Sequence, residues 1–264
     1  MYFFFLFFSI YTISANQSTC KSCSWDVYNR ELKKETLSFM CVNIRSITGK
    51  FQELRSHLSM LKNKITFLVI TETWLNIEKD YALELGGYKS VSIYRNRLGG
   101  GIKIYFLDYI DVSVIDILPL SETCETLFLK AIIPGFGKLT LGGIYRPPNK
   151  SVPNFLLHMS DILSSLSNTR SVICGDFNLD IMKLNECNQV SDYVDVMSSY
   201  GFINSFDIPT YVSPITNSDS SCLDHLWHNL SIVNQKIFIK PNLADHYAIS
   251  SLFNKNKQTK LISI

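Results

Sequence analysis

Many short apolar runs, rich in β-branched and aromatic residues, make up most of this chain. Runs of this kind, bounded by Gly, Pro, Asn and Asp, are typical of β-strands. Longer segments with apolar residues at helical spacing occur at residues 49–64, 152–167 and 190–200. The predicted strands are residues 37–43, 65–72, 88–94, 102–107, 111–117, 125–133, 138–145, 171–176, 222–227, 236–240 and 247–253.

The connections between these runs are of two kinds. The turn sequence PGFG at residues 134–137 joins two strands directly as a hairpin. The helical segments 49–64 and 152–167 instead separate strands as crossovers. Hairpins make antiparallel neighbours and helical crossovers make parallel ones, so we expect mixed sheets. The sequence therefore predicts a layered α/β sandwich.

Composition is consistent with one large domain. Hydrophobic residues make up 46% of the 264 residues and charged residues 18%, which allows a sizeable core. The formal net charge of +2 excludes a strongly basic nucleic-acid-binding protein, but not an enzyme that holds phosphate with a few local cations. We assign residues 1–36 to an apolar leader and linker, residues 37–253 to one domain, and residues 254–264 to a short polar tail.

The chain begins with an almost entirely apolar stretch, MYFFFLFFSIYTISA. This stretch is too short to span a bilayer comfortably. It has the apolar core of a signal peptide, with Ala15 as a cleavage position, but no Lys or Arg precedes Lys21. Two readings stay open. It is either a signal or short anchor that takes the chain to a membrane or out of the cell, or translated sequence upstream of the domain.

The cysteines do not form a recognisable zinc site. Cys20 and Cys23 make a CxxC pair, but no second pair follows to complete a set of four ligands. Others lie in apolar, strand-like runs, where we expect buried thiols. These are Cys41, Cys124, Cys174 and Cys222.

Polar residues lie at the ends of several predicted strands. They are Asn43, Glu72, Tyr145, Arg146, Asp176, Asn178, Asp224, Asp245 and His246. Each alone has a structural explanation. The sequence GDFN at residues 175–178, for instance, consists of residues that turns select. Together they are complementary, because strands of one sheet system can bring their ends to one rim, where ligands of open α/β sheets bind.

The residue types at this rim suit metal-assisted hydrolysis of a phosphodiester. Carboxylate and amide oxygens are the hard ligands that Mg²⁺ or Mn²⁺ prefers. A histidine beside an acid can carry a proton near neutral pH, and Tyr, Asn and Arg can hold phosphate oxygens. The sequence has no serine nucleophile elbow and no Walker-type phosphate loop that would favour another chemistry.

The ordered motifs NIRS, TETW, YRPP, GDFN, LDH and DH resemble those of the endonuclease/exonuclease/phosphatase superfamily. The likeness is closest to the endonuclease domain of non-LTR retrotransposons, and it covers residues 37–253. It implies a four-layer α/β sandwich in which two mixed β-sheets pack face to face with helices outside. One departure is Ala244, where the last motif usually has a serine.

The resemblance also implies how the rim would hold a metal and a water molecule. Glu72, with help from Asn43, would hold a catalytic Mg²⁺ or Mn²⁺, and Asp245 would lie near the metal or its waters. Asp176 would orient or deprotonate the attacking water. No small-molecule cofactor is implied beyond the metal.

The remaining implied roles concern the phosphate and DNA. Asn178 and Tyr145 would position the phosphate. His246 would stabilise charge on a phosphoryl oxygen, held in orientation by Asp224. DNA is the implied partner, and the expected contacts to its backbone are Arg146, Arg45 and Arg95.

Three functions are compatible with these patterns. The first is a Mg²⁺-dependent endonuclease of retrotransposon type that acts in the nucleus and nicks DNA to leave a 3′-hydroxyl. The second is a secreted nuclease, or a phosphodiesterase acting on lipid or inositol phosphates, which the signal-like N-terminus favours. The third is a catalytically inactive transposon relic, suggested by Ala244 and by the end of the chain at Ile264, where a reverse transcriptase would normally follow.

Overall fold

The computed structural model describes residues 21–95, 99–116, 122–215, 218–230, 235–239 and 243–254. The signal-like stretch at residues 1–15 and nearly all of the predicted tail at 254–264 lie outside these ranges. Among the helices of the described residues, none is long and apolar enough to cross a membrane.

The first large sheet has seven strands in the order β1-β14-β15-β2-β3-β5-β4. It is mixed, because β1–β14 and β2–β3 are parallel pairs and the other neighbours are antiparallel. Its strands are β1 (Lys21–Cys23), β2 (Thr36–Asn43), β3 (Phe67–Thr71), β4 (Tyr88–Ile93), β5 (Ile102–Leu107), β14 (Gln235–Ile239) and β15 (Ala248–Asn254).

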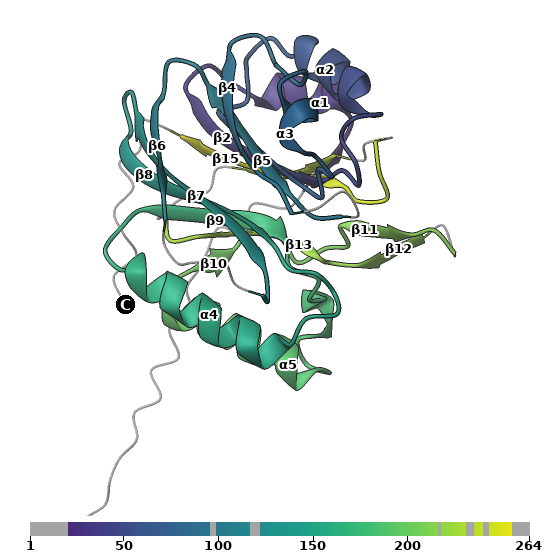
Figure 1. The fold of residues 1–264 in the computed structure, drawn as a ribbon, viewed down its shortest axis with the longest axis vertical. Coiled ribbons are helices and arrows are strands. Elements are labelled where there is room, and N and C mark those ends of the chain that lie inside the picture. Colours follow the sequence, from purple (N-terminus) through teal and green to yellow (C-terminus); the bar gives the residue numbers. More distant parts are fainter. Residues whose placement is uncertain are drawn as a thin grey trace, which may run out of the picture.

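The second large sheet has six strands in the order β10-β13-β9-β8-β7-β6, and only its β8–β9 pair is parallel. The PGFG hairpin predicted from the sequence is confirmed as β7–β8. A small two-stranded sheet projects from the side of the molecule (Figure 1). The strands are β6 (Asp111–Ile115), β7 (Glu125–Ile133), β8 (Gly137–Tyr145), β9 (Ser171–Asp176), β10 (Ile203–Asn204), β13 (Asp224–His228) and, in the small sheet, β11 (Tyr211–Ser213) and β12 (Ser218–Ser221).

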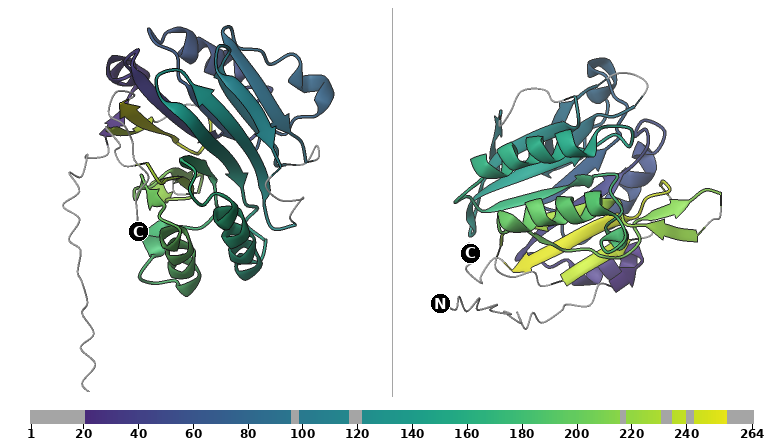
Figure 2. Two further views of the ribbon diagram at one scale, coloured as in Figure 1. Left: turned by 90° about the vertical axis from the view of Figure 1, so that its left-hand side faces the viewer. Right: turned by 90° about the horizontal axis from the view of Figure 1, so that it is seen from below.

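Helices form the two outer layers (Figure 1). α1 (Trp25–Glu31), α2 (Phe51–Ser59) and α3 (Ile77–Asp80) lie on the side of the first sheet. α4 (Val152–Ser165) and α5 (Asn188–Ser199) contact each other and lie side by side across the outer face of the second sheet (Figure 2). A short 3₁₀ turn, η1 (Ile181–Lys183), precedes α5. The predicted sandwich of two mixed sheets with helices outside is therefore confirmed.

The apolar runs are nearly continuous because both faces of each sheet are covered. In β2, Phe39 and Cys41 point into the core between the two sheets. Met40 and Val42 point to the opposite face and pack beneath the helices of the first sheet. A third apolar cluster lies between the second sheet and α4 and α5. Three apolar layers thus hold four structural layers together.

The folded region begins before the predicted boundary at Leu37. β1 pairs in parallel with β14, and α1 places Tyr28 and Leu32 in the outer core of the first sheet. The Tyr28 hydroxyl lies 3.0 Å from Ser250 Oγ. Residues 21–32 therefore belong to the fold and not to a linker. The sequence signal was weak because a seven-residue helix presents only one or two inward positions.

Candidate active site

Polar residues from both sheets meet at one edge of the sandwich. In the first sheet β2 ends at Asn43, and Glu72 directly follows the neighbouring strand β3. In the second sheet Asp176 ends β9, with Tyr145 of β8 on one side and Asp224 of β13 on the other. The structure thus brings together residues that the sequence placed at five separate strand ends.

Asn43 connects the two sheets through its side-chain amide. Its Nδ2 donates to Asp176 Oδ2 at 2.7 Å and lies 3.3 Å from Glu72 Oε1. Its Oδ1 accepts the main-chain N–H of Arg45 at 3.1 Å. The amide oxygen is therefore turned toward the main chain. In this arrangement Asn43 orients the two carboxylates through its Nδ2, and the second lone pair of its oxygen is left for another partner.

The backbone around the rim has an unusual number of left-handed residues. Arg45, Ser46, Glu72, Trp74 and Asn178 all have φ between 43° and 72°. Non-glycine residues rarely adopt this conformation, and where they do the surrounding structure must hold them. Here the main chains of the two loops are joined by a hydrogen bond of 2.9 Å from Ser46 N to Glu72 O. The loops therefore present their side chains from fixed, strained positions.

Gly175 is required by the close approach of two strands. A Cβ at this position would lie 1.7 Å from the main-chain oxygen of Ile144 on β8, and φ is +157°. No side chain fits there. The sequence analysis explained this glycine by a turn, whereas the structure explains it by the parallel pairing of β8 and β9 immediately before Asp176.

Phe177 points back into the protein and is fully buried. Its ring stacks on His225 with centroids 5.0 Å apart. Tyr193 Oη lies 3.0 Å from His225 Nδ1 and accepts a 2.7 Å hydrogen bond from Trp227 Nε1. Burial lowers the pKa of His225 to about 4, so this imidazole is neutral. A buried aromatic cluster therefore supports the GDFN turn from below.

Asp176, Asp224 and His246 form a compact buried group. A nitrogen or oxygen atom from each lies within 4.8 Å of the other two. His246 Nδ1 and Asp224 Oδ2 are 2.7 Å apart, as expected for a histidine oriented by an acid. Within the part of the chain that the structure describes, no donor reaches the buried Asp224 Oδ1.

The protonation of this group follows from its burial and its charges. Burial, followed by the charge of the neighbouring Asp224 carboxylate, raises the pKa of Asp176 to about 7. Burial alone would lower the pKa of His246, but the charge and hydrogen bond of Asp224 raise it to about 9. Near neutral pH, Asp176 can exchange a proton while His246 is positively charged.

Asn178 and Tyr145 hold the carboxylates on either side. The main-chain N–H of Asn178 donates to Asp176 Oδ1 at 2.9 Å, and its Nδ2 donates to the main-chain oxygen of Arg146 at 2.8 Å. Burial, together with the charge of the nearby Glu72 carboxylate, raises the pKa of the Tyr145 phenol well above its usual value. Tyr145 therefore keeps its proton and can act as a donor.

Arg146 corrects the sequence-based prediction of a DNA contact. It is only 2% exposed. Its Nε donates to Phe177 O at 2.7 Å and its Nη2 to Asn178 O at 2.8 Å. Its Nη1 donates to Lys150 O at 2.8 Å. The guanidinium thus stabilises the GDFN turn from inside the protein and has no face free for a phosphate.

The other two predicted DNA contacts remain at the surface. Arg45 Nη1 lies 2.5 Å from Asp245 Oδ2, with side chains 42% and 19% exposed. Arg95 Nη1 lies 3.2 Å from Glu125 Oε1, and Glu125 also accepts the N–H of Gly101. Both cations lie in exposed ion pairs, which phosphate oxygens can compete for at small cost.

Sequence reasoning missed residues that hold the site from neighbouring loops. Trp74 Nε1 donates to Glu72 Oε2 at 2.9 Å. Thr210 Oγ1 accepts the N–H groups of Leu223 and Asp224, each at 3.0 Å. Tyr211 lies in an isolated antiparallel bridge with His246. The tryptophan stood beside a predicted ligand in TETW, but nothing in the sequence indicated the threonine or the bridge.

Comparison with known proteins agrees with this geometry. The family model described as endonuclease-reverse transcriptase matches residues 139–250. The endonuclease domain of TRAS1, a telomere-specific non-LTR retrotransposon, superimposes with a TM-score of 0.64 at 13% identity over 84% of this chain and 100% of that one. The 3′-5′ exonuclease NExo from Neisseria meningitidis gives 0.63 at 15% identity, over 82% and 99%. An AP endonuclease from Archaeoglobus fulgidus gives 0.59 at 17%, over 83% and 99%.

The family model covers part of the rim, and the structural matches cover most of the chain. The family model includes the segments of Tyr145, Asp176, Asp224 and His246. The structural matches cover more than four-fifths of the chain at low identity, and so establish the fold. The resemblance found in the sequence is confirmed: the chain has the endonuclease/exonuclease/phosphatase fold, and its residues 139–250 match the endonuclease-reverse transcriptase family.

Proposed function

We propose that this protein is a Mg²⁺-dependent DNA endonuclease of retrotransposon type that nicks one strand and leaves a 3′-hydroxyl. The hydrogen-bonded set of Glu72, Asn43 and Asp176 beside the His246–Asp224 pair is the observation that carries the proposal. The likeness to the TRAS1 endonuclease domain supports DNA as the substrate. So does the likeness to D. rerio TDP2, which has been solved with a single-strand DNA product.

The rim fits a divalent cation with hard oxygen ligands. Glu72 is partly exposed, and within the described residues no cation forms an ion pair with its carboxylate. Trp74 and Asn43 each donate to one of its oxygens, which still leaves lone pairs for a metal. Glu72 would hold Mg²⁺, and Asp245 would contact its waters. Bound there, the ion would neutralise charge on the phosphate.

Asp176 is the residue we assign to the attacking water. Its carboxylate is held by Asn43 Nδ2 and by the main-chain N–H of Asn178, so its direction is fixed. A pKa near 7 suits a general base at neutral pH. The water oxygen would form a bond to phosphorus and pass a proton to Asp176. The bond from phosphorus to the 3′-oxygen would break, and the released 3′-oxygen would take up a proton from solvent water. The products are a 3′-hydroxyl and a 5′-phosphate.

Residues beside Asp176 would stabilise the negative charge on the phosphate. His246 is protonated at neutral pH and oriented by Asp224, so it can donate to a phosphoryl oxygen. Tyr145 keeps its phenolic proton and can donate as well. The longer contact of Asn178 Nδ2, 3.3 Å to Asp176, is the one that a phosphate oxygen would replace.

Supercoiled plasmid is the substrate that tests this proposal. We expect Mg²⁺ or Mn²⁺ to support conversion to the nicked circle and EDTA to abolish it. A DNA polymerase that requires a 3′-hydroxyl should extend from the nick without prior treatment. Nicking that continues in EDTA would remove the metal mechanism, and nicks that cannot be extended would contradict the 3′-hydroxyl product.

The apolar start of the sequence favours a second candidate, a secreted nuclease or a phosphodiesterase of the same fold. Plasmid DNA, sphingomyelin and inositol phosphates, compared at the same Mg²⁺ concentration, separate the candidates. Faster hydrolysis of a lipid or inositol phosphate would replace the DNA assignment. An inactive relic would bind DNA and nick nothing. Tagged full-length chain tests location, which we propose to be nuclear for the DNA endonuclease.

A further inference from the structure

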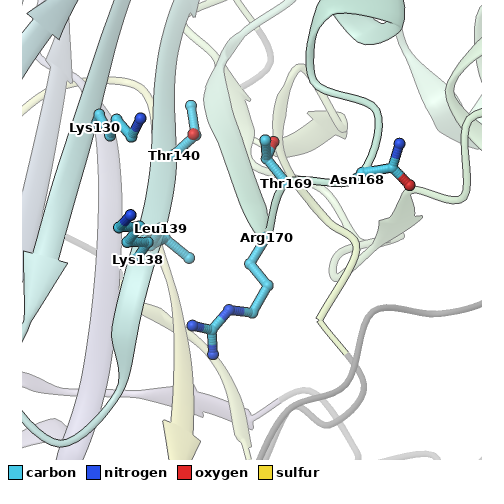
Figure 3. Close-up of a pocket in the computed structure, with 7 residues that line it drawn as sticks. All are labelled: Lys130, Lys138, Leu139, Thr140, Asn168, Thr169 and Arg170. Atoms are coloured by element: carbon cyan, nitrogen blue, oxygen red, sulfur yellow. The ribbon is translucent and has the colours of Figure 1, made fainter.

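A carboxylate of the second sheet lies beside the candidate active site and faces the first sheet. β7 and β8 run side by side from the hollow shown in Figure 3, which Lys130 and Lys138 line, to the rim, where Glu125 lies directly opposite Tyr145. Side chains alternate along a strand, and both Leu127 and Tyr145 belong to the core between the sheets. Glu125 therefore points toward the first sheet as well, and its side chain is only 15% exposed.

Glu125 binds the main chain of a glycine segment, Gly99–Gly101, that directly precedes β5 of the first sheet. Its Oε2 accepts the N–H of Gly101 at 2.5 Å, and its Oε1 accepts from Arg95 Nη1 at 3.2 Å. A Cβ on Gly100 would lie 2.2 Å from Glu125 Oε1, and φ of Gly100 is +71°. A side chain at Gly100 would displace the carboxylate. The glycine therefore gives Glu125 access to the main chain.

The glycine segment in turn holds the two residues that follow Glu72. The main-chain N–H of Thr73 donates to Gly101 O at 3.2 Å, and that of Trp74 donates to Gly100 O at 3.0 Å. The indole Nε1 of Trp74 then donates to Glu72 Oε2 at 2.9 Å. A series of hydrogen bonds thus runs from the β7 carboxylate, through the glycine segment, to the carboxylate that is proposed to hold the metal.

The segment around Glu72 needs support of this kind. Glu72 has a φ of 51° and Trp74 a φ of 53°, a conformation that non-glycine residues keep only where their surroundings hold them. The Trp74 side chain is 36% exposed, so packing covers it only in part. On one side Ser46 N donates to Glu72 O, and on the other side the glycine segment binds the main chain. Glu125 fixes this second side from the opposite sheet.

We propose that Glu125 is a positioning residue for the metal-binding carboxylate. It holds the glycine segment, and through that segment Trp74, in the place that directs Glu72 toward the cation. This inference rests on the proposed function, because that function assigns the metal to Glu72. There are two alternatives. Glu125 could stabilise only the fold, or it could attract the cation by its own negative charge.

Calorimetric titration of metal-free protein with Mg²⁺ separates the three roles. Glu125→Ala removes the acceptor for Gly101 and should weaken Mg²⁺ binding about tenfold, the scale typical of residues that orient metal ligands. Glu125→Gln keeps an oxygen that can accept the same N–H and should recover most of the affinity. Glu122→Ala, which removes an exposed acid three residues away, is the matched control and should bind Mg²⁺ like the parent. Equal weakening in Glu125→Ala and Glu125→Gln would assign the effect to charge, and a lower melting temperature with unchanged Mg²⁺ affinity would assign it to the fold. Either result overturns the proposal.

A double variant tests whether Glu125 acts through the indole. Trp74→Phe keeps an aromatic ring but removes the N–H that binds Glu72. If both residues act on Glu72 along the same path, Glu125→Ala combined with Trp74→Phe should bind Mg²⁺ no more weakly than the weaker of the two single variants. A loss equal to the product of the two single losses would show that Glu125 acts independently, and would contradict the proposal.

Nitrogen-15 NMR of the metal-free protein separates a failure of this inference from a failure of the proposed function. The chain has three tryptophans, and Trp74→Phe identifies which Nε1–H signal belongs to Trp74. We expect this signal to shift in Glu125→Ala and to return toward the parental position in Glu125→Gln. An unshifted signal, in a protein whose parent binds Mg²⁺, would overturn the positioning role alone. A parent that binds no Mg²⁺ would overturn the proposed function and with it the metal role of Glu125.

Discussion

Asp176 and Asp224 lie directly opposite each other in the antiparallel pair β9–β13, and both are almost completely buried. Like charges in this relationship destabilise a sheet. The pair is tolerated because Asn43 donates to one carboxylate and His246 to the other. Burial, followed by the facing Asp224 carboxylate, raises the pKa of Asp176 to about 7. The unfavourable strand pairing thus adds to burial in making a carboxyl group that titrates near neutral pH.

Asp176→Asn should separate catalysis from binding. We expect DNA binding to persist and nicking to fall by about two orders of magnitude or more, the usual scale for loss of a general base. The melting temperature should stay level or rise, because the variant removes one of two facing charges. A plasmid-nicking time course, a DNA-binding measurement and a melting curve check this. Asp192→Asn, an exposed acid on α5, is the control. If Asp176→Asn nicks at the parental rate, GDFN is only a turn.

Glu72→Gln should remove the metal without unfolding the protein. The amide keeps the shape of the side chain but loses the charge that holds a hard cation. We expect calorimetry of metal-free protein to show no Mg²⁺ binding, and nicking to fall sharply at any Mg²⁺ concentration. Glu78→Gln, an exposed acid on α3, should behave like the parent. His246→Ala should still bind Mg²⁺. Loss of binding in His246→Ala would instead place the ion in the Asp176–Asp224–His246 group.

Arg146→Gln should lower the free energy of unfolding and leave DNA binding unchanged. The guanidinium satisfies the carbonyls of Phe177, Asn178 and Lys150, and leaving such buried groups unpaired costs on the order of 3 kcal/mol. We expect urea unfolding to show this loss. The salt dependence of DNA binding should not change. Arg45→Gln should do the reverse, keeping stability and reducing the slope of log K against log salt by about 0.9. A reduced slope with unchanged stability for Arg146→Gln would restore it as a DNA contact.

His228 should make the fold sensitive to acid. Burial lowers its pKa from 6.5 to about 4, so the unfolded chain binds a proton that the folded protein does not. The stability this residue contributes is present above pH 6.5 and lost progressively as the pH falls toward 4. With about 1.4 kcal/mol for each pKa unit, the loss reaches about 3 kcal/mol. His228→Phe keeps a ring against Phe253 and should flatten this part of the stability curve. Urea midpoints at several pH values measure it, and identical curves for the two proteins would contradict the assignment.

The rim was predictable from sequence because each of its residues follows or precedes an apolar run. A strand that passes through a covered sheet must be apolar until it leaves the core, so Asp176 after VIC and Glu72 after LVIT mark the exit points. The sheet pairings then bring those exits together. Sequence spacing could not show how close they come. The Asn43–Asp176 hydrogen bond crosses between sheets and joins residues 133 positions apart.

Arg146 shows where the same reasoning failed. The sequence showed a cation at a strand end, and the family resemblance implied that it contacts the DNA backbone. Side chains alternate along a strand, and Tyr145 belongs to the core between the sheets. The next residue therefore turns to the other side, where its guanidinium lies over Phe155. For α1 and β1 the difficulty was different, since such short elements have too few residues to show a period.

Because the candidate site is divided between two sheets, the core between them also sets the geometry of the site. Asn43 and Glu72 belong to one sheet, and Tyr145 and Asp176 to the other. The distance between the halves is set by the apolar layer that separates the sheets, well below the surface where DNA would lie. The thickness of that layer therefore sets the spacing between the catalytic residues of the two sheets. A methyl group added or removed deep in the sandwich changes the width of the gap in which the phosphate must fit.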